Sequence, residues 1–187
     1  MTVYIALLRG INVSGKNVMK MADLKNALST LNLEHLQTYL QSGNLIFLSD
    51  ENDAHLLSKR ISEVILQEFD YEVAVKVVRH KDFRCGLSEN PFMNRPLIDT
   101  KKLYYINLFE KVTQEGFDKL VLEGNFDEEM VLGESEQIIY VHYPNGFGRS
   151  KLTHRYFENK LSVFVTARNH NTMSKLDILS RNLIQKT

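Results

Sequence analysis

The sequence of 187 residues predicts an α+β fold made of two consecutive βαββαβ units with antiparallel sheets, plus a C-terminal helix. Three observations support this prediction. The same order of strand-like and helix-like segments occurs twice along the chain. In each half, a short polar segment joins two strands as a hairpin. Between the halves, residues 84–101 contain two of the three prolines and no sustained hydrophobic period, which is typical of a connection.

The first half follows the order strand, helix, strand, strand, helix, strand. Strands are indicated by apolar or alternating residues, and helices by apolar residues at helical spacing. Asn52 or Asp53 is expected to cap the second helix, since either side chain accepts hydrogen bonds from free N–H groups. The predicted elements are a strand at 3–8, a helix containing Leu24, Ala27, Leu28 and Leu31, strands at 36–41 and 45–48, a helix with Leu57, Ile61, Val64 and Ile65 as its buried stripe, and a strand at 73–78.

The second half repeats this order and adds one helix. Its hairpin is expected around residues 133–136, a segment with glycine and polar residues between two apolar runs. The predicted elements are a strand at 103–109, a short helix with Phe117, Leu120 and Val121, strands at 129–132 and 138–143, a helix with Leu152, Tyr156 and Phe157, a strand at 162–166, and a final helix with Met173, Leu176, Leu179 and Leu183 on one face.

This order corresponds to the split βαβ, or ferredoxin-like, motif, in which helices cover one face of an antiparallel sheet. We therefore predict a first ferredoxin-like subdomain at residues 1–83, a connection at 84–101, and a second ferredoxin-like subdomain with the C-terminal helix at 102–187. The sequence shows no clear residue-level repeat, so the duplication rests on the order of the elements alone.

Charge and composition narrow the function classes. The 23 Lys and Arg residues balance the 23 Asp and Glu residues, which disfavours a broad nucleic-acid or anionic-membrane surface. The single cysteine, Cys85, excludes an internal disulfide framework and a Cys-rich zinc module. No apolar run approaches the ~20 residues that span a bilayer, and the N-terminus lacks the basic segment of a signal peptide. We expect a soluble cytoplasmic protein with no membrane partner.

Residues 10–17, GINVSGKN, match the P-loop pattern G-x-x-x-x-G-K but end on Asn17 where a P-loop has Ser or Thr. Asn17 lacks the hydroxyl that coordinates magnesium. The helical period begins near residues 21–24, several residues after Lys16, so a bound phosphate would not lie at a helix N-terminus. The turn at 42–44 also joins its strands too closely for a parallel crossover. The sequence therefore predicts a polar turn and no nucleotide hydrolysis.

Three polar loops nevertheless combine basic residues with Asn or Ser, a chemistry that binds phosphate or carboxylate groups. A glycine turn explains the first loop equally well, and a glycine turn followed by a serine cap explains the second loop alone better than an anion site does. For the third loop the alternative is a helix cap at Asn171 or Thr172. If the fold brings the loops together, they form one anion pocket. The candidate ligand-binding residues are Arg9, Asn12, Lys16 and Asn17 in the first loop, Ser42 and Asn44 in the hairpin turn, Arg149, Ser150 and Lys151 before a helix, and Arg168 and Asn169 in a loop before the last helix.

The sequence identifies neither a metal site nor a catalytic residue. The six histidines show no metal-binding spacing such as H-x-x-x-H. His154 lies four residues from Ser150, but no acidic residue suggests a nucleophilic triad. We predict no metal and no cofactor, and we leave open whether the protein is an enzyme.

Two strings, LLRGINVSGKN at 7–17 and TYLQSGN at 38–44, resemble the signatures of the DUF1697 family. NPF at 90–92, RSKL at 149–152 and TARN at 166–169 fit later motifs of that family in the same order. The resemblance implies a mostly bacterial, intracellular α+β protein with ferredoxin-like subdomains and no established reaction. The family usually has tryptophan after the TARN run, where this chain has His170.

Three functions stay open at this point. The first is a protein that binds a small phosphorylated or otherwise anionic ligand through the basic loops. The second is a module for RNA or single-stranded nucleic acid, although the neutral charge and the lack of an RNP1-like string disfavour nucleic acid as a partner. The third is a protein-interaction domain without a ligand. Aromatic residues on predicted strands favour the second function, because ferredoxin-like sheets can present such rings to bases; they are Tyr104, Tyr105, Phe109, Tyr140 and Tyr143.

Overall fold

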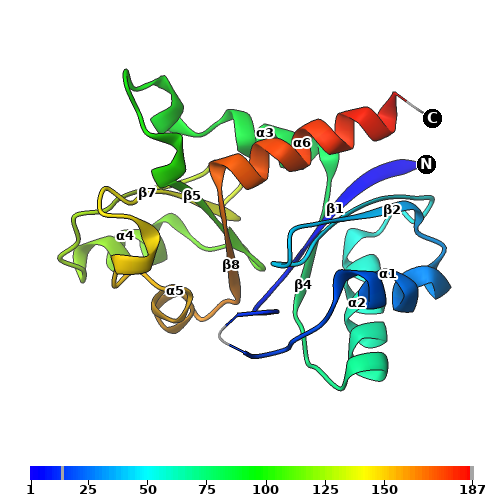
Figure 1. Cartoon of the computed structure of the whole chain (residues 1–187). Helices are drawn as coiled ribbons and strands as arrows, with labels where there is room; N and C mark the ends of the chain where they lie inside the picture. The colour runs from blue at the N-terminus through cyan, green and yellow to red at the C-terminus, as the bar shows by residue number, and fades with distance from the viewer. Residues whose placement is uncertain (14, 186–187) are drawn as a thin grey trace. The chain divides into compact units, whose positions relative to one another are not determined.

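The computed structural model describes residues 1–13 and 15–185. The chain divides into two compact units: unit 1 comprises Met1–Arg84 and the C-terminal segment that begins at Lys175, and unit 2 comprises Cys85–Ser174. Each unit contains a four-stranded antiparallel sheet with two helices between its strands (Figure 1). The predicted α+β fold, with two βαββαβ-like units and a C-terminal helix, is confirmed.

Unit 1 is a complete ferredoxin-like unit. Its strand order is β2-β3-β1-β4, and all neighbouring strands are antiparallel. Its elements are β1 (Thr2–Leu8), α1 (Met21–Ala27), the 3-10 turn η1 (Leu28–Leu31), β2 (Glu34–Tyr39), β3 (Asn44–Ser49), α2 (Ala54–Phe69) and β4 (Val75–Arg79).

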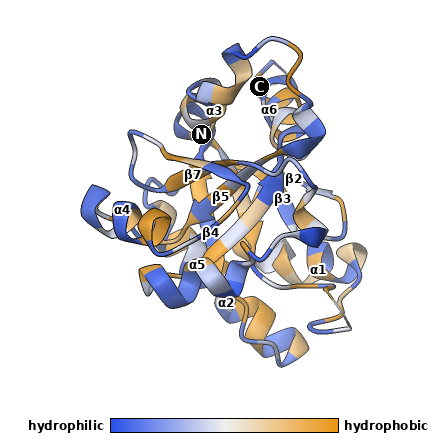
Figure 2. Cartoon of the chain, turned by 90° about the vertical axis from the view of Figure 1, so that its left-hand side faces the viewer, coloured by the Kyte–Doolittle hydropathy of each residue, from blue (hydrophilic) through white to orange (hydrophobic). Residues whose placement is uncertain are grey.

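Alternation along the strands decides which side of this sheet the helices cover. Successive strand residues point to opposite faces, so Tyr4, Ala6 and Leu8 share one face of β1. These residues are buried in one apolar cluster with the inner faces of α1 and α2. In Figure 2 the ribbon of α2 shows hydrophilic and hydrophobic segments along its length, as an amphipathic helix should. Asp53 caps α2, because its Oδ1 accepts hydrogen bonds from the N–H groups of His55 and Leu56, as predicted.

Unit 2 repeats this topology with the strand order β6-β7-β5-β8. Its core joins one face of the sheet to two helices through buried residues such as Ile106, Phe117 and Phe157. Its elements are η2 (Pro91–Asn94), η3 (Thr100–Lys102), β5 (Leu103–Leu108), α4 (Gln114–Leu122), β6 (Glu129–Leu132), β7 (Ile138–His142), η4 (Phe147–Arg149), α5 (His154–Leu161) and β8 (Val165–Asn169).

The strand register shows the duplication that the sequence alone does not. In each unit the last residue of the fourth strand lies opposite a tyrosine of the first strand: Arg79 is opposite Tyr4, and Asn169 is opposite Tyr104. The next residue is a histidine in both units, and it begins the helices α3 (His80–Ser88) and α6 (His170–Ile184). The two halves are therefore alike in element order and in the strand-to-helix junction that ends each sheet.

Several boundaries differ from those predicted by a few residues, and the predicted helix residue Leu152 precedes α5. The last strand runs over Val165–Asn169 and not over 162–166, because Ser162 ends α5 in the left-handed conformation, with a φ of 57°. Helix α3 begins at His80, inside the predicted first subdomain, and runs to Ser88 in the predicted connection. The second half of α6 also belongs to unit 1, whereas the predicted subdomains kept the whole helix with the second half of the chain.

Within the described residues, no helix is long and apolar enough to cross a membrane.

Candidate functional site

The first predicted loop is held together by the side chain of Asn12. Its Nδ2 donates hydrogen bonds to the carbonyl oxygens of Gln41, at 2.8 Å, and Met19, at 2.9 Å. Its Oδ1 accepts the N–H of Met19 at 2.9 Å. Asn12 has a φ of 52°, in the left-handed region that asparagine tolerates better than most residues. This side chain therefore fastens the loop to the hairpin turn between β2 and β3.

Gly43 allows the loop and the hairpin turn to approach each other. A Cβ atom at this position would lie 2.6 Å from both Cδ1 of Ile11 and Cβ of Leu8, and its φ is 74°. The Leu8 N–H donates a hydrogen bond to the Gly43 carbonyl oxygen at 2.8 Å. The neighbouring Asn44 is buried, and its Nδ2 donates to the carbonyl oxygen of Tyr39 and to Oγ of Ser42. The two strings at 7–17 and 38–44 thus meet in unit 1.

The remaining residues of this loop divide into structural and charged groups. Asn17 donates from Nδ2 to the Gly10 carbonyl oxygen at 3.1 Å, so it too supports the backbone. Arg9 is half-buried and Lys16 is exposed. Helix α1 begins at Met21, which confirms that no helix N-terminus follows Lys16 directly. The ligand-binding role of these residues stays a prediction.

The predicted cations Arg149 and Lys151 are exposed in unit 2. The sequence predicted that this stretch leads into a helix, with a serine cap as the alternative to an anion site. Instead, α5 begins at His154 and its cap is Thr153, whose Oγ1 accepts the N–H of Tyr156. Oγ of Ser150 accepts the N–H of Leu152 at 2.9 Å, a local turn that precedes the helix.

The sequence predicted a loop at Arg168, but this residue lies in strand β8. Its side chain is buried, with 6% of the residue exposed. Its Nη1 donates hydrogen bonds to Oγ1 of Thr166 at 2.8 Å and to the carbonyl oxygen of Ala167 at 2.9 Å. Burial lowers the pKa of the guanidinium to about 10. The next residue, Asn169, accepts the N–H of Thr172 on Oδ1 and so caps the first turn of α6. These residues belong to unit 2, and a pocket shared with the first loop stays a prediction.

His170 occupies the position at which the DUF1697 resemblance leads us to expect a tryptophan. Its Nδ1 lies 3.0 Å from the hydroxyl of Tyr105, and its Nε2 lies 3.1 Å from Oγ of Ser174. Partial burial lowers the pKa of the imidazole, so the neutral form predominates near pH 7. Burial also raises the pKa of Tyr105 to about 12, which keeps the phenol protonated. The imidazole thus connects β5 to the first turns of α6 through two polar contacts.

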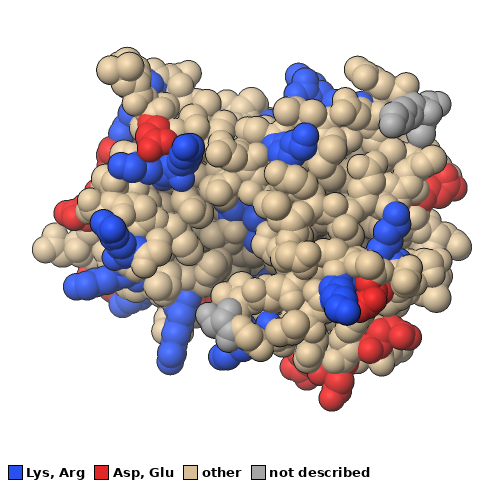
Figure 3. All heavy atoms as spheres, viewed as in Figure 1, with Lys and Arg blue, Asp and Glu red and all other residues tan. Residues whose placement is uncertain are grey.

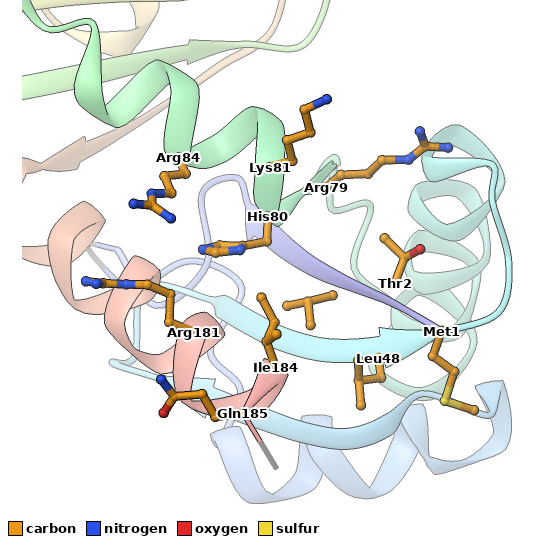
Figure 4. A pocket seen from close by; sticks show the side chains of 11 residues that line it. Met1, Thr2, Leu48, Arg79, His80, Lys81, Arg84, Arg181, Ile184 and Gln185 are labelled. Atoms are coloured by element: carbon orange, nitrogen blue, oxygen red, sulfur yellow. The ribbon is translucent and has the colours of Figure 1, made fainter. Parts of the chain in front are cut away.

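Unit 1 also contains a cavity that the sequence did not predict, with a volume of about 690 Å³. The cavity lies between residues near the ends of strands β1, β3 and β4 and parts of α3 and α6 (Figure 4). No Asp or Glu is among its described lining residues. Its four basic side chains are Arg79, Lys81, Arg84 and Arg181.

Contacts that link the side chains of His80, Asp177 and Arg181 in series order one end of this cavity. Nε2 of His80 lies 2.8 Å from Oδ1 of the buried Asp177, and Nη2 of Arg181 lies 3.0 Å from the second oxygen of that carboxylate. Arg84 is one turn after His80 on α3, so both side chains share a helix face. Figure 4 shows the guanidinium groups of Arg84 and Arg181 on the same side of the His80 ring.

The electrostatic balance of the cavity is positive. Asp177 offsets part of the charge of Arg181. The guanidinium of Arg79 donates to a neutral group, the Asn52 carbonyl oxygen. Lys81 and Arg84 are exposed. In Figure 3, several basic side chains have acidic ones near them. The cavity is therefore a local positive site in a chain of zero net charge.

Comparison with known proteins places this fold in a family. The family described as "Protein of unknown function (DUF1697)" matches residues 1–138. The chain belongs to the DUF1697 family. A solved structure, that of the conserved bacterial protein SP0830 from Streptococcus pneumoniae, has a TM-score of 0.70 and 24% sequence identity, and the match covers 96% of this chain and 98% of that chain. This likeness shows the shared fold. No curated protein matches the chain.

In this DUF1697 protein, the two strings at 7–17 and 38–44 build the packed loop, whereas the cavity uses other residues. The run RHKDFR at 79–84 supplies three of the four basic side chains. This local density of positive charge is the feature of the sequence that could have indicated the cavity. Arg181 and Asp177 lie almost a hundred residues later, and no local pattern connects them to this run. The cavity becomes visible only when the fold is known.

Proposed function

We propose that this DUF1697 protein binds a small phosphorylated or otherwise anionic ligand in the cavity of unit 1. One observation supports this most directly: four basic side chains line a single cavity that has no acid among its described lining residues. Like charges around a concave surface repel one another, and a bound anion relieves that repulsion. The volume of about 690 Å³ lies in the range of roughly 300–1,000 Å³ that is usual for small-molecule sites.

The geometry suggests how the anion is held. Guanidinium groups present several N–H donors in one plane and bind phosphate or carboxylate oxygens in pairs. Asp177 fixes Arg181 through the 3.0 Å contact, and His80 fixes Asp177 in turn, so this guanidinium is ordered before the ligand arrives. Less side-chain entropy is then lost on binding. Arg84 approaches from the other helix and completes the pair of donors.

The packing of unit 2 disfavours the nucleic-acid alternative. Tyr105, Tyr140 and Tyr143 are fully or almost fully buried, so their rings are not available to stack on bases. Tyr104 is half-buried and stacks on Phe147, with ring centroids 4.8 Å apart. Of the three functions that the sequence left open, anion binding is the one supported by a defined cavity.

A thermal-shift screen with inorganic phosphate, sugar phosphates, nucleotides and carboxylates tests the proposal. A ligand at about 100 times its Kd is expected to raise the Tm by roughly 5–10 °C, through mass action on the folded state. Arg84→Gln and Arg181→Gln should remove most of the rise. The control is Arg155→Gln, which removes an exposed arginine on α5 and should leave the rise intact.

Arg181→Gln also breaks the contact with Asp177, so its own Tm without ligand must be measured first. Arg84→Gln breaks no such contact with an acidic side chain among the residues that the structure describes, and it therefore decides the test. A flat screen overturns the proposal, and so does a rise in Tm that Arg84→Gln leaves unchanged.

A further inference from the structure

The cavity of unit 1 has an apolar side opposite its basic end. Val3 and Leu48 come from neighbouring strands of the sheet and are buried, while Ile184 and Met1 reach the cavity at its edge. Ile184 is 49% exposed and Met1 is 63% exposed. In Figure 4, Leu48 and Met1 lie away from the two guanidinium groups, and Ile184 lies between the two ends.

This combination distinguishes the cavity from a simple phosphate site. A site for a bare inorganic anion needs donors and a positive field, and gains nothing from exposed aliphatic side chains. Here the exposed Ile184 stands beside Arg181 on the last turns of α6, where a polar residue would cost the fold little. A ligand with an apolar part would remove Ile184, Met1 and the accessible atoms of the sheet from water.

We infer that the ligand is an amphipathic anion, in which a phosphate or carboxylate group is joined to an apolar body. The inference rests on the proposed function and adds the chemical class of the ligand. The anionic group binds between Arg84 and Arg181. The apolar body lies along Ile184 and over the sheet residues Val3 and Leu48.

A series of alkyl phosphates measures how much the apolar part of the ligand contributes to the affinity. Inorganic phosphate and ethyl, butyl and hexyl phosphate carry the same anionic group with increasing apolar length. Isothermal titration calorimetry at constant ionic strength is expected to show the affinity rising about fourfold for each methylene that becomes buried. The heat-capacity change of binding should become more negative along the series, as burial of apolar surface requires.

Two variants on one helix separate the apolar contribution from general effects on α6. Ile184→Ser should flatten the dependence of the affinity on chain length. Ile178→Ser is the control, because Ile178 is 43% exposed on the same helix but is not part of the cavity lining. Arg84→Gln should weaken every member of the series by a similar factor.

The outcomes distinguish this inference from the proposed function beneath it. If inorganic phosphate and hexyl phosphate bind equally and both depend on Arg84, the anion site stands and the amphipathic ligand is wrong. If Ile184→Ser leaves the increase of affinity with alkyl chain length unchanged, the inference is also overturned. If no member of the series binds, the amphipathic ligand is wrong, and the thermal-shift screen with the other anions decides whether the anion site stands.

A phosphate group joined to an apolar body occurs both in free metabolites and in membrane lipids. Co-sedimentation with phosphatidylcholine vesicles, with and without phosphatidic acid, separates these sources. Binding of hexyl phosphate without binding to either vesicle supports a free ligand. Binding to the phosphatidic acid vesicles that Ile184→Ser and Arg84→Gln each abolish supports a lipid as the source of the same group.

Discussion

Nε2 of His80 lies 2.8 Å from Oδ1 of Asp177, and both side chains are buried in unit 1. The two residues are 97 positions apart in the chain, so this contact ties the first residue of α3 to the second half of α6. The second carboxylate oxygen of Asp177 meets Arg181 at 3.0 Å. The pair thus stabilises the fold and also orders one cation of the proposed ligand site.

We predict that His80→Ala lowers the free energy of unfolding by about 2 kcal/mol or more, because a buried hydrogen-bonding group of Asp177 loses its partner. Urea denaturation at pH 7 measures the loss. The control is Glu115→Gln, which breaks the exposed pair with Lys119 on α4 and should cost no more than about 0.5 kcal/mol. Equal losses for the two variants would show that the His80–Asp177 contact is energetically unimportant.

Gly43→Ala should destabilise unit 1 for two independent reasons. The new Cβ would come within 2.6 Å of Leu8 and Ile11, and alanine is strained at a φ of 74°. We expect a loss of about 2 kcal/mol or more in the free energy of unfolding. Gly148→Ala is the matched control, because a Cβ at that position would meet no heavy atom within 4 Å and its φ is not positive. If Gly43→Ala left the free energy of unfolding unchanged, the loop would be able to move away from the hairpin turn.

The element order could be predicted from sequence because it depends on local signals. The hairpin turns, the Asp53 cap and the apolar stripe of α2 each lie within a few residues of the element they define. Side-chain periodicity then indicates which face is buried. These features specify both ferredoxin-like units without any knowledge of distant contacts.

The site could be predicted only in part, because its residues obtain their roles from distant partners. Asn12 and Asn44 belong to a polar segment typical of ligand loops, yet their amides bond to backbone carbonyl oxygens. The sequence predicted a loop at Arg168 because Arg168, Asn169 and Asn171 are polar and follow the predicted strand. Pairing with β5 extends the strand through these residues, and the hydrogen bond from Arg168 to Thr166 satisfies two polar groups within the sheet.

The stability of unit 1 should depend on pH through Lys76, which is buried in β4. Burial lowers the pKa of its ammonium to about 8, whereas the unfolded chain has a pKa of about 10.4. Between these values the unfolded state binds more protons, so the free energy of unfolding rises with pH. The full rise is roughly 3 kcal/mol.

Urea denaturation of the wild type and of Lys76→Met at pH 7.5, 9 and 10.5 measures this effect. The wild type should gain stability relative to the variant as the pH rises, because methionine does not titrate. Lys20→Met removes an exposed lysine and should follow the wild type at all three values. Parallel curves for wild type and Lys76→Met would contradict the lowered pKa.

The last prediction separates the cavity from the three-loop pocket that the sequence suggested. If Arg9 and Arg168 contact the ligand, Arg9→Ala and Arg168→Ala should each abolish the ligand-induced rise in Tm. If the cavity of unit 1 alone binds the anion, both variants keep the rise, since neither residue lines it. We expect the second result, because the guanidinium of Arg168 is buried and donates to Thr166 and Ala167.

Stability and binding must be scored separately in this test. Arg168→Ala should lower the Tm without ligand, because the buried Oγ1 of Thr166 and the half-buried Ala167 carbonyl lose their donor. Arg9→Ala, at a half-buried position, should lower it less. The decisive quantity is therefore the difference in Tm with and without hexyl phosphate for each variant. If that difference vanishes in Arg9→Ala and Arg168→Ala but survives in Arg84→Gln, the anion binds at the predicted loops and not in the cavity.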